Sequence, residues 1–132
     1  MPGEGVGGPT NKAAVKVVAL ISALPDISRD DFIAYYEANH VPLVRRLLPT
    51  IGDYRRNYVE PQPINRPGEP SPGFDVITEL WFETEDDYQA FRRTVSDPEV
   101  VAQIRADEAN FLVSARTRMH VVREHIAPPR QG

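Results

Sequence analysis

His40 is the residue whose type and position best suit chemistry in this sequence. It is one of three histidines in the 132-residue chain, and it lies in an apolar helical stripe directly before Val41 and Pro42. An imidazole, with a typical pKa of about 6.5, gives or takes a proton near neutral pH. A proline break frees backbone groups and opens room that a ligand can use. His40 is therefore either a proton shuttle or a buried histidine bonded to a carbonyl that Pro42 leaves unpaired.

Glu79 is the second candidate, because it lies in the middle of an apolar strand on the face that also carries Trp81. A carboxylate on a buried face is costly unless it is paired or faces a wet cavity. One interpretation is a salt bridge to Arg56 or Arg118. The other is a catalytic role in which the carboxylate orients or activates His40.

Further side chains are candidates for lining a ligand pocket. Aromatic residues with polar tips suit an apolar or aromatic ligand, but they also serve as core or as a dimer interface. Asp107 and Glu108 form an acidic pair on a predicted helix, where they are either surface charge or a clasp to a strand arginine. The substrate-binding candidates are Tyr36, Tyr54, Tyr58, Trp81, Met119 and His120.

The amino-acid composition excludes several classes of protein and of catalytic site. The chain has no Cys, 13 Pro and a formal net charge of −4. These values exclude a disulfide scaffold and a thiol nucleophile, and they argue against nucleic-acid binding. Motifs for nucleotides, metals or a Ser triad do not occur, so we expect no metal and no cofactor. The longest apolar run, Val17 to Ile21, is too short to cross a bilayer, and we expect a cytoplasmic protein with no membrane contact.

Hydrophobic spacing predicts four strands and three helical regions. The strands are expected at 15–23, 51–60, 75–83 and 115–124. Helices are expected after the capping residues Ser28, Thr84 and Asp97. Pro42 should kink or restart the first helix near His40, because proline removes an amide donor and pushes Val41 away from helical geometry.

The order β–α–β–β–α–β is typical of a ferredoxin-like α+β fold, in which a four-stranded antiparallel sheet carries helices on one face. We expect the other face to be too apolar for water and to be covered by a second copy of the chain. Two sheets meeting face to face form a barrel with an enclosed cavity. The residues expected on this open face are Tyr54, Tyr58, Ile77, Trp81 and either Met119 or His120.

The chain divides into one domain with flanking segments. Residues 1–13 read as a disordered leader, and 14–125 form the folded domain. Within it, 61–73 is a proline-rich surface loop that is expected to cover the cavity. Residues 126–132 read as a flexible tail.

Several stretches resemble the EthD family of the dimeric α+β barrel superfamily. They are Phe32-x-x-Tyr35-Tyr36-Glu37-x-x-His40-Val41-Pro42-Leu43, Pro49-x-Ile51-x-x-Tyr54, Glu79-Leu80-Trp81-Phe82 and Asp107-Glu108-x-x-Phe111. The resemblance runs from about Val15 to Glu124. It implies a ferredoxin-like protomer, a face-to-face homodimer and a cavity that contains the histidine of the H-x-P-L stretch, which is His40. Glu79 matches an acidic position of the family.

The resemblance and the residues together favour a cofactor-independent enzyme of isomerase or lyase type. It would shuttle a proton next to a carbonyl of an apolar or aromatic, polyketide-like or catabolic substrate, as a decarboxylase, dehydratase, cyclase or lactone isomerase. A non-catalytic binding or accessory protein for a neighbouring oxygenase is the first alternative. The second is a monooxygenase that either needs no cofactor or binds haem through His40 or His120.

Overall fold

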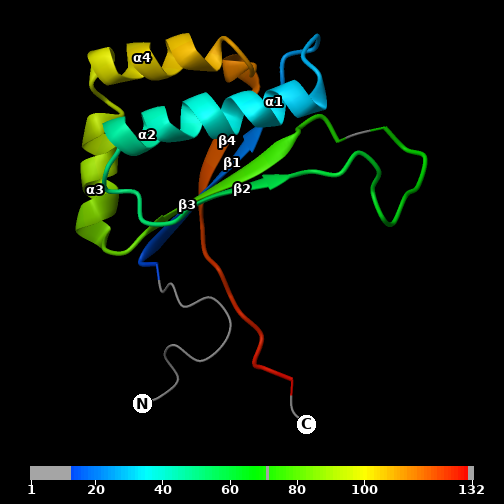
Figure 1. The fold of residues 1–132 in the computed structure, drawn as a ribbon. Coiled ribbons are helices and arrows are strands. Elements are labelled where there is room, and N and C mark those ends of the chain that lie inside the picture. The colour runs from blue at the N-terminus through cyan, green and yellow to red at the C-terminus, as the bar shows by residue number, and fades with distance from the viewer. Residues whose placement is uncertain (1–12, 71, 131–132) are drawn as a thin grey trace.

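The computed structural model describes residues 13–70 and 72–130, and it shows a four-stranded sheet with helices on one face (Figure 1). This arrangement confirms the predicted ferredoxin-like α+β fold. The strands are β1 (Val15–Ile21), β2 (Tyr54–Tyr58), β3 (Val76–Phe82) and β4 (Arg118–Val122). The helical segments are α1 (Arg29–Tyr35), the π-helical turn η1 (Tyr36–His40), α2 (Val41–Leu47), α3 (Glu85–Thr94), α4 (Pro98–Glu108) and the 3₁₀ turn η2 (Ser114–Arg116).

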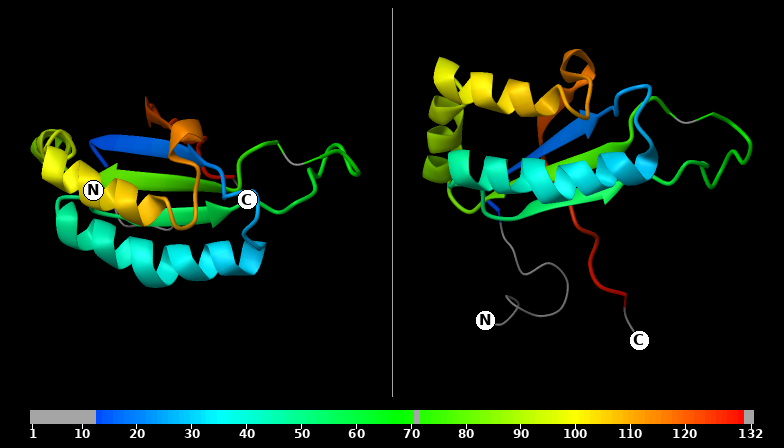
Figure 2. Two further views of the ribbon diagram at one scale, coloured as in Figure 1. Left: turned by 90° about the horizontal axis from the view of Figure 1, so that it is seen from above. Right: turned by 45° about the horizontal axis from the view of Figure 1, so that its top comes forward.

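The sheet has the strand order β2-β3-β1-β4, and every neighbouring pair is antiparallel. Residues directly opposite each other in such pairs lie on the same face. Ala19 is opposite both Thr78 and Met119, so these three side chains lie on the face that the helices cover. Figure 2 shows α1, α2 and α4 along this face, which we call the helix face.

Two predicted positions on the open face are wrong. Tyr54 is opposite Leu80 and Tyr58 is opposite Val76, and both partners belong to the buried helix face. The sequence places the two tyrosines on a common face because they are four residues apart, but only the register of β2 decides which face. The choice left open on β4 is also settled, since Met119 lies on the helix face and His120, opposite Val18, lies on the open face.

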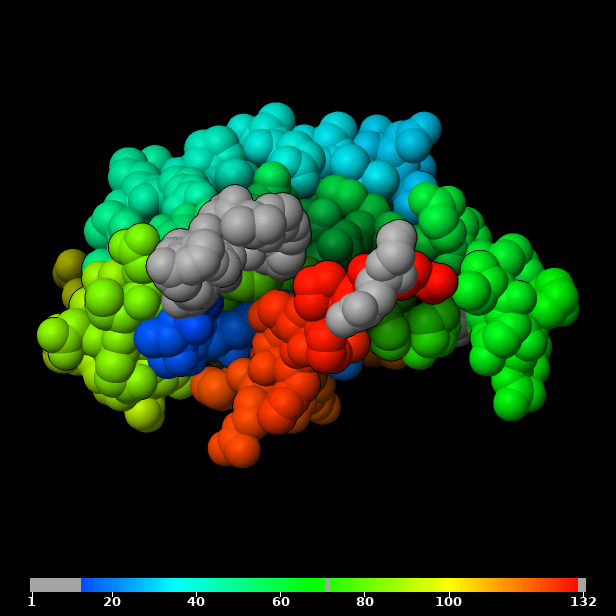
Figure 3. Space-filling model, turned by 90° about the horizontal axis from the view of Figure 1, so that it is seen from below, coloured from blue at the N-terminus to red at the C-terminus, as the bar shows by residue number. Residues whose placement is uncertain are grey.

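The open face of the sheet, which is on the side that Figure 3 views from below, is less apolar than predicted. Apolar side chains alternate there with charged and polar ones. The apolar members are the half-buried Val18, Leu20 and Ile77, the buried Trp81 and the exposed Val122, and the polar members are Lys16, Arg55, Asn57, Glu79, Arg118 and His120.

The helices begin where their capping residues predict. The side-chain oxygens of Ser28, Thr84 and Asp97 accept hydrogen bonds from first-turn N–H groups at 3.1, 3.0 and 2.9 Å. Each cap satisfies one of the amide donors that a helix start leaves unpaired. Pro98 follows Asp97 at the start of α4, where its missing N–H costs nothing.

The predicted restart near His40 is found, since a π turn ends at His40 and α2 begins at Val41, but Pro42 does not push Val41 out of helical geometry as expected. Val41 keeps helical angles, with φ −59° and ψ −49°, and its N–H binds the Tyr36 carbonyl five residues back. The chain thus accommodates the proline with a wider π turn, and α2 continues directly from η1. Single π turns of this kind occur often at functional sites.

Aromatic rings fill the core between the helices and the sheet. Phe32, Tyr36, Phe82, Phe111 and Val76 are each less than 2% exposed. Phe111, which follows α4, lies 5.6 Å from the ring centre of Phe32 and 5.2 Å from that of Tyr36. These contacts anchor α4 against η1 and so fix the relative positions of the two elements that carry the site described below.

The predicted flanking segments fall partly outside the described residues. Of the leader, residues 1–12 lie outside them, as do 131–132 of the tail. The 61–73 loop extends beyond the end of the sheet (Figure 1), and Ile64 in it is fully exposed. Residues 123–130 follow β4 without regular secondary structure. In the part of the chain that is described, no helix has both the length and the apolar character needed to cross a membrane.

Candidate active site

His40 is held by a carboxylate from another helix. Its side chain is 6% exposed, and Nδ1 lies 2.8 Å from Oδ2 of Asp107 in α4. A carboxylate accepts hydrogen bonds, so this contact places the Nδ1 proton between the two groups. The other ring nitrogen, Nε2, has no hydrogen-bond partner among residues 13–70 and 72–130. The backbone-carbonyl partner considered from the sequence is therefore not found.

Tyr35 fixes the second oxygen of Asp107. The Tyr35 hydroxyl donates to Oδ1 at 2.6 Å and accepts a hydrogen bond from Asn110 at 2.8 Å. The hydrogen bond to Asp107 raises the pKa of the Tyr35 phenol, and burial adds to this effect. With both oxygens engaged, the carboxylate cannot rotate freely, and it orients the imidazole as an outer partner orients a catalytic or metal-bound histidine.

His40 lines a cavity of about 230 Å³ between the helix layer and the sheet. Its floor is formed by β1, β2, β3 and β4, and its roof by η1, α2, α3 and α4. The walls are mainly apolar, with a few convergent polar groups, as is usual for small-molecule sites. The cavity therefore lies inside one protomer, under the helices, and not in a hollow between two open sheet faces as the sequence suggested.

Two tyrosines place hydroxyl groups in this cavity. The Tyr36 hydroxyl is 2.7 Å from Oγ1 of Thr78, and it also interacts with the hydroxyl of Tyr54. Burial raises the pKa of both phenols, and the interaction with Tyr36 raises that of Tyr54 further. Both groups therefore stay protonated and can donate hydrogen bonds near neutral pH. The ring of Tyr36 lies 5.5 Å from that of His40, so donors and imidazole share one end of the cavity.

The structure separates the predicted site residues into three places. His40, Tyr36, Tyr54 and Met119 line the helix-side cavity. Glu79, Trp81 and His120 belong to the open face. Tyr58 lines a second pocket.

Glu79 is not paired with His40, because the sheet separates them, and the proposed bridges to Arg56 and Arg118 are also absent. Its partners are Nζ of Lys16 at 3.2 Å, the Asn57 amide at 2.9 Å and the Trp81 indole at 2.9 Å. Burial alone would raise the pKa of Glu79, but these three donors together lower it. The carboxylate is charged and fully engaged, and it has no geometry for activating His40.

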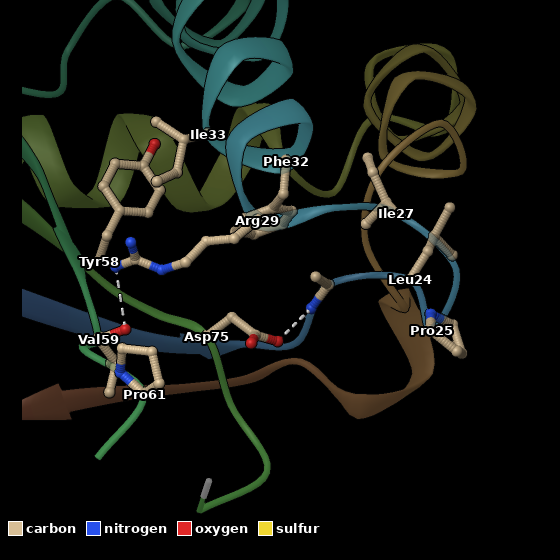
Figure 4. A pocket seen from close by; sticks show the side chains of 11 residues that line it. Leu24, Pro25, Ile27, Arg29, Phe32, Ile33, Tyr58, Val59, Pro61 and Asp75 are labelled. Atoms are coloured by element: carbon tan, nitrogen blue, oxygen red, sulfur yellow. Dashed lines mark hydrogen bonds between the residues drawn. The ribbon is translucent and has the colours of Figure 1, made fainter. Parts of the chain in front are cut away.

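The second pocket, about 300 Å³, lies at the end of the sheet where the 61–73 loop begins (Figure 4). Arg29 extends along it and donates to the Val59 carbonyl at 3.1 Å, and Asp75 accepts from the Ala23 N–H at 2.7 Å. Of the described loop residues 61–70 and 72–73, Pro61 lines this pocket, and none lines the His40 cavity. The loop is therefore not a lid over that cavity.

Asp107 is the member of the candidate site whose contact with His40 sequence reasoning missed. From the sequence, Asp107 and Glu108 were an acidic pair interpreted as surface charge or as a clasp to a strand arginine, and neither was placed beside His40. Helical spacing does not identify it, because the buried Phe111 lies beyond the end of α4 at Glu108, and the contact with His40 follows from how α4 packs on η1. Groups of three or more metal-ligating side chains do not occur in the described parts of the chain.

The fold and the site together define a ferredoxin-like α+β protein with a helix-side cavity. The chain belongs to the EthD family, because the EthD domain model matches residues 24–115, which is more than half of the chain. No curated protein sequence matches it.

Solved structures share the fold at low sequence identity. An EthD family protein from Bacillus halodurans C-125 is 19% identical, with 84% of this chain and 98% of that chain covered and a TM-score of 0.57. The protein At3g17210 from Arabidopsis thaliana is 13% identical, with 87% and 99% covered and a TM-score of 0.59. SnoaB, a cofactor-independent oxygenase from Streptomyces nogalater, is 13% identical, with 88% and 97% covered and a TM-score of 0.50.

Proposed function

We propose that this protein is a cofactor-independent enzyme of isomerase or lyase type that moves a proton next to a carbonyl. The substrate is a small apolar or aromatic compound bound in the helix-side cavity. The single observation that carries the proposal is the His40–Asp107 pair, in which one ring nitrogen is fixed and the other has no described partner beside an apolar cavity. An oriented imidazole of this kind is suited to general acid–base catalysis.

The proposed step is redox-neutral. Nε2 of His40 removes a proton from the carbon next to the carbonyl, and the C–H electron pair forms an enolate. Hydroxyl groups of Tyr36 and Tyr54 donate hydrogen bonds to the developing enolate oxygen. Asp107 stabilises the resulting imidazolium, which then returns the proton to the substrate at the same or another atom.

A model ketone tests this step without knowledge of the natural substrate. We expect the protein to catalyse exchange of the acetyl protons of 2-acetylnaphthalene in deuterium oxide, measured by proton NMR. Replacing His40→Gln should slow the exchange by about 10²–10⁴-fold, the usual contribution of a positioned acid–base group. His125→Gln, in the exposed tail, is the matched control and should leave the rate unchanged.

The outcomes separate the alternative functions. Binding of the ketone with no exchange would favour a non-catalytic binding protein. Oxygen uptake during the same incubation would favour the type of activity for which SnoaB is named. Exchange that survives His40→Gln would rule out the proposed role of the imidazole.

We also propose that the open face pairs with a second copy of the chain. Val18, Leu20 and Ile77 are only half-buried there, and a sheet with helices on one side leaves such residues to a partner. Sedimentation analysis should show a dimer that dissociates in Leu20→Glu but not in Ile64→Glu, a fully exposed loop position. A wild-type monomer would contradict this proposal and would leave the cavity chemistry untouched.

A further inference from the structure

The end of the helix-side cavity opposite Tyr54 contains a polar atom without a partner. Oγ1 of Thr117 is buried and makes no hydrogen bond, and it is the one buried side-chain N or O atom of this kind among residues 13–70 and 72–130. Thr117 lines the cavity directly before β4. A buried hydroxyl without a partner destabilises the folded protein, so a ligand that bonds to it recovers that loss.

An arginine without a partner lies at the same end. Arg105 in α4 lines the cavity, and its guanidinium forms no ion pair or hydrogen bond with any described residue. By contrast, the guanidinium of Arg56 is held by Glu37 at 2.7 Å. Arg105 is exposed to solvent, which places it at the mouth of the cavity.

One acidic residue also faces this region. Glu108 lines the cavity one turn after Arg105, and its Oε1 accepts a hydrogen bond from the Ser114 hydroxyl at 2.7 Å. Glu108 and Arg105 are not close enough to form a salt bridge in the described structure. The Arg105 guanidinium and the Thr117 hydroxyl are therefore two donors that are available to a ligand. The Glu108 carboxylate is an acceptor that already has the Ser114 hydroxyl as its donor.

The two polar ends of the cavity lie far apart. Tyr54 is on β2 and Thr117 adjoins β4, and these are the two edge strands of the sheet. Three strand spacings of about 4.8 Å separate the edges, which gives roughly 14 Å. The floor between them includes the apolar side chains of Ala19, Ile21 and Leu80. This layout fits a flat, elongated ligand with a polar group at each end.

We propose that the ligand bears a carboxylate, which Arg105 and Thr117 bind at the mouth while its carbonyl group lies by Tyr36 and Tyr54. The carbonyl end of this assignment rests on the proposed function. Both free groups donate hydrogen bonds, and a guanidinium matches the two oxygens of a carboxylate. The substrate class is therefore an aromatic or apolar keto acid.

The second pocket is a poorer carboxylate site, although it also contains an arginine. Arg29 already donates to the Val59 carbonyl and lies 3.5 Å from Glu60. Asp75 places a negative charge on the wall of that pocket, as Glu108 does in the helix-side cavity, so the second pocket differs in that its arginine is already hydrogen-bonded. Arg29 therefore provides a matched control for the removal of an arginine from a pocket.

A probe pair tests the assignment by isothermal calorimetry. The probes are 6-acetyl-2-naphthoate and its methyl ester, which share a ketone and differ in the charge at the opposite end. The wild-type protein should bind the acid at least about tenfold more tightly, as expected for a charge-assisted hydrogen bond. Arg105→Met should abolish this preference, and Thr117→Val should reduce it about threefold or more.

The controls make each result decisive. Arg29→Met should keep the preference for the acid, and its loss in that variant would overturn the assignment in favour of the second pocket. Equal affinity of the wild type for acid and ester would also overturn it, as would a preference that survives Arg105→Met. His40→Gln should keep the preference while losing proton exchange, so a failure of the proposed function and a failure of this assignment are distinguishable.

Discussion

The two faces of the sheet each hold a carboxylate near an aromatic side chain, but only one of them has the geometry for catalysis. On the open face, Glu79 accepts hydrogen bonds from Lys16, Asn57 and Trp81. On the helix face, Asp107 is bonded to Tyr35 and His40. In the first network, all three donors are bonded to the carboxylate, and no reactive group is attached to it. In the second, the carboxylate holds Nδ1 of His40, so that Nε2 of the same ring is oriented and has no described partner.

The difference teaches how to separate a structural polar cluster from a reactive one. Burial and charge are present on both faces, and a buried carboxylate alone does not mark a site. What distinguishes the helix face is an unused hydrogen-bonding atom next to a cavity, in a network whose other atoms are fixed.

The largest expected effect is on catalysis. Asp107→Asn should lower the rate of ketone proton exchange by about 10²–10⁴-fold, because an amide does not hold the imidazole in the required tautomer or stabilise its charged form. Glu79→Gln should change the rate less than about twofold, since its interactions are on the other side of the sheet. The rates are measured by NMR with the same ketone.

Equal exchange rates in Asp107→Asn and Glu79→Gln would contradict the distinction between the two faces. Circular dichroism and thermal melting of both proteins establish that each is folded. A folded Asp107→Asn protein with a normal rate would remove the carboxylate from the mechanism.

The next largest effect is on stability. Phe111→Ala should cost about 3–5 kcal/mol in the free energy of unfolding, because this ring is fully buried between Phe32 and Tyr36. Leu20→Ala on the open face should cost about 1 kcal/mol in a monomer, since the side chain is half-buried. Urea titration measures both values, and a larger loss for Leu20→Ala that grows with protein concentration would indicate the proposed dimer.

The smallest effect is on the response to acid. The hydrogen bond from Arg56 lowers the pKa of Glu37 below its ordinary value of 4.5, against the effect of burial and with help from Tyr58. Glu37 therefore stabilises the fold at pH values above 4.5, and this contribution is lost as the pH falls through the lowered folded-state pKa. The contribution is less than about 1 kcal/mol because the side chain is partly exposed.

Chemical denaturation across this pH range, with Glu37→Gln as the comparison, measures the contribution. The wild type should be the more stable protein near neutral pH, and the two curves should converge in acid. A difference that is independent of pH would show that the carboxylate charge has no role.

The strands and helix starts could be predicted because their signals are local. Alternation in β3 places Val76 and Thr78 on one face and Glu79 on the other, and the structure has that arrangement. The oxygens of Ser28 and Thr84 cap helices at the predicted residues. These features depend on neighbours within a few residues of each other.

The site depended on contacts that local patterns do not contain. His40 and Asp107 are 67 residues apart, and their meeting follows from how α4 packs on η1. The face of Tyr54 depended on the register between two strands. Pro42 was expected to kink or restart the helix near His40, and the structure has a π turn at this point that keeps Val41 in helical geometry.

The most direct test of the central claim is the tautomer of His40, measured by nitrogen-15 NMR near neutral pH and assigned with His40→Gln. The proton of the neutral ring should reside on Nδ1, facing Asp107, and Nε2 should report an unprotonated nitrogen that shifts when the model ketone binds. In Asp107→Asn this preference should disappear. A proton on Nε2 in the wild type, or an Nε2 signal that ignores the ketone, would contradict the assignment of His40 as the base.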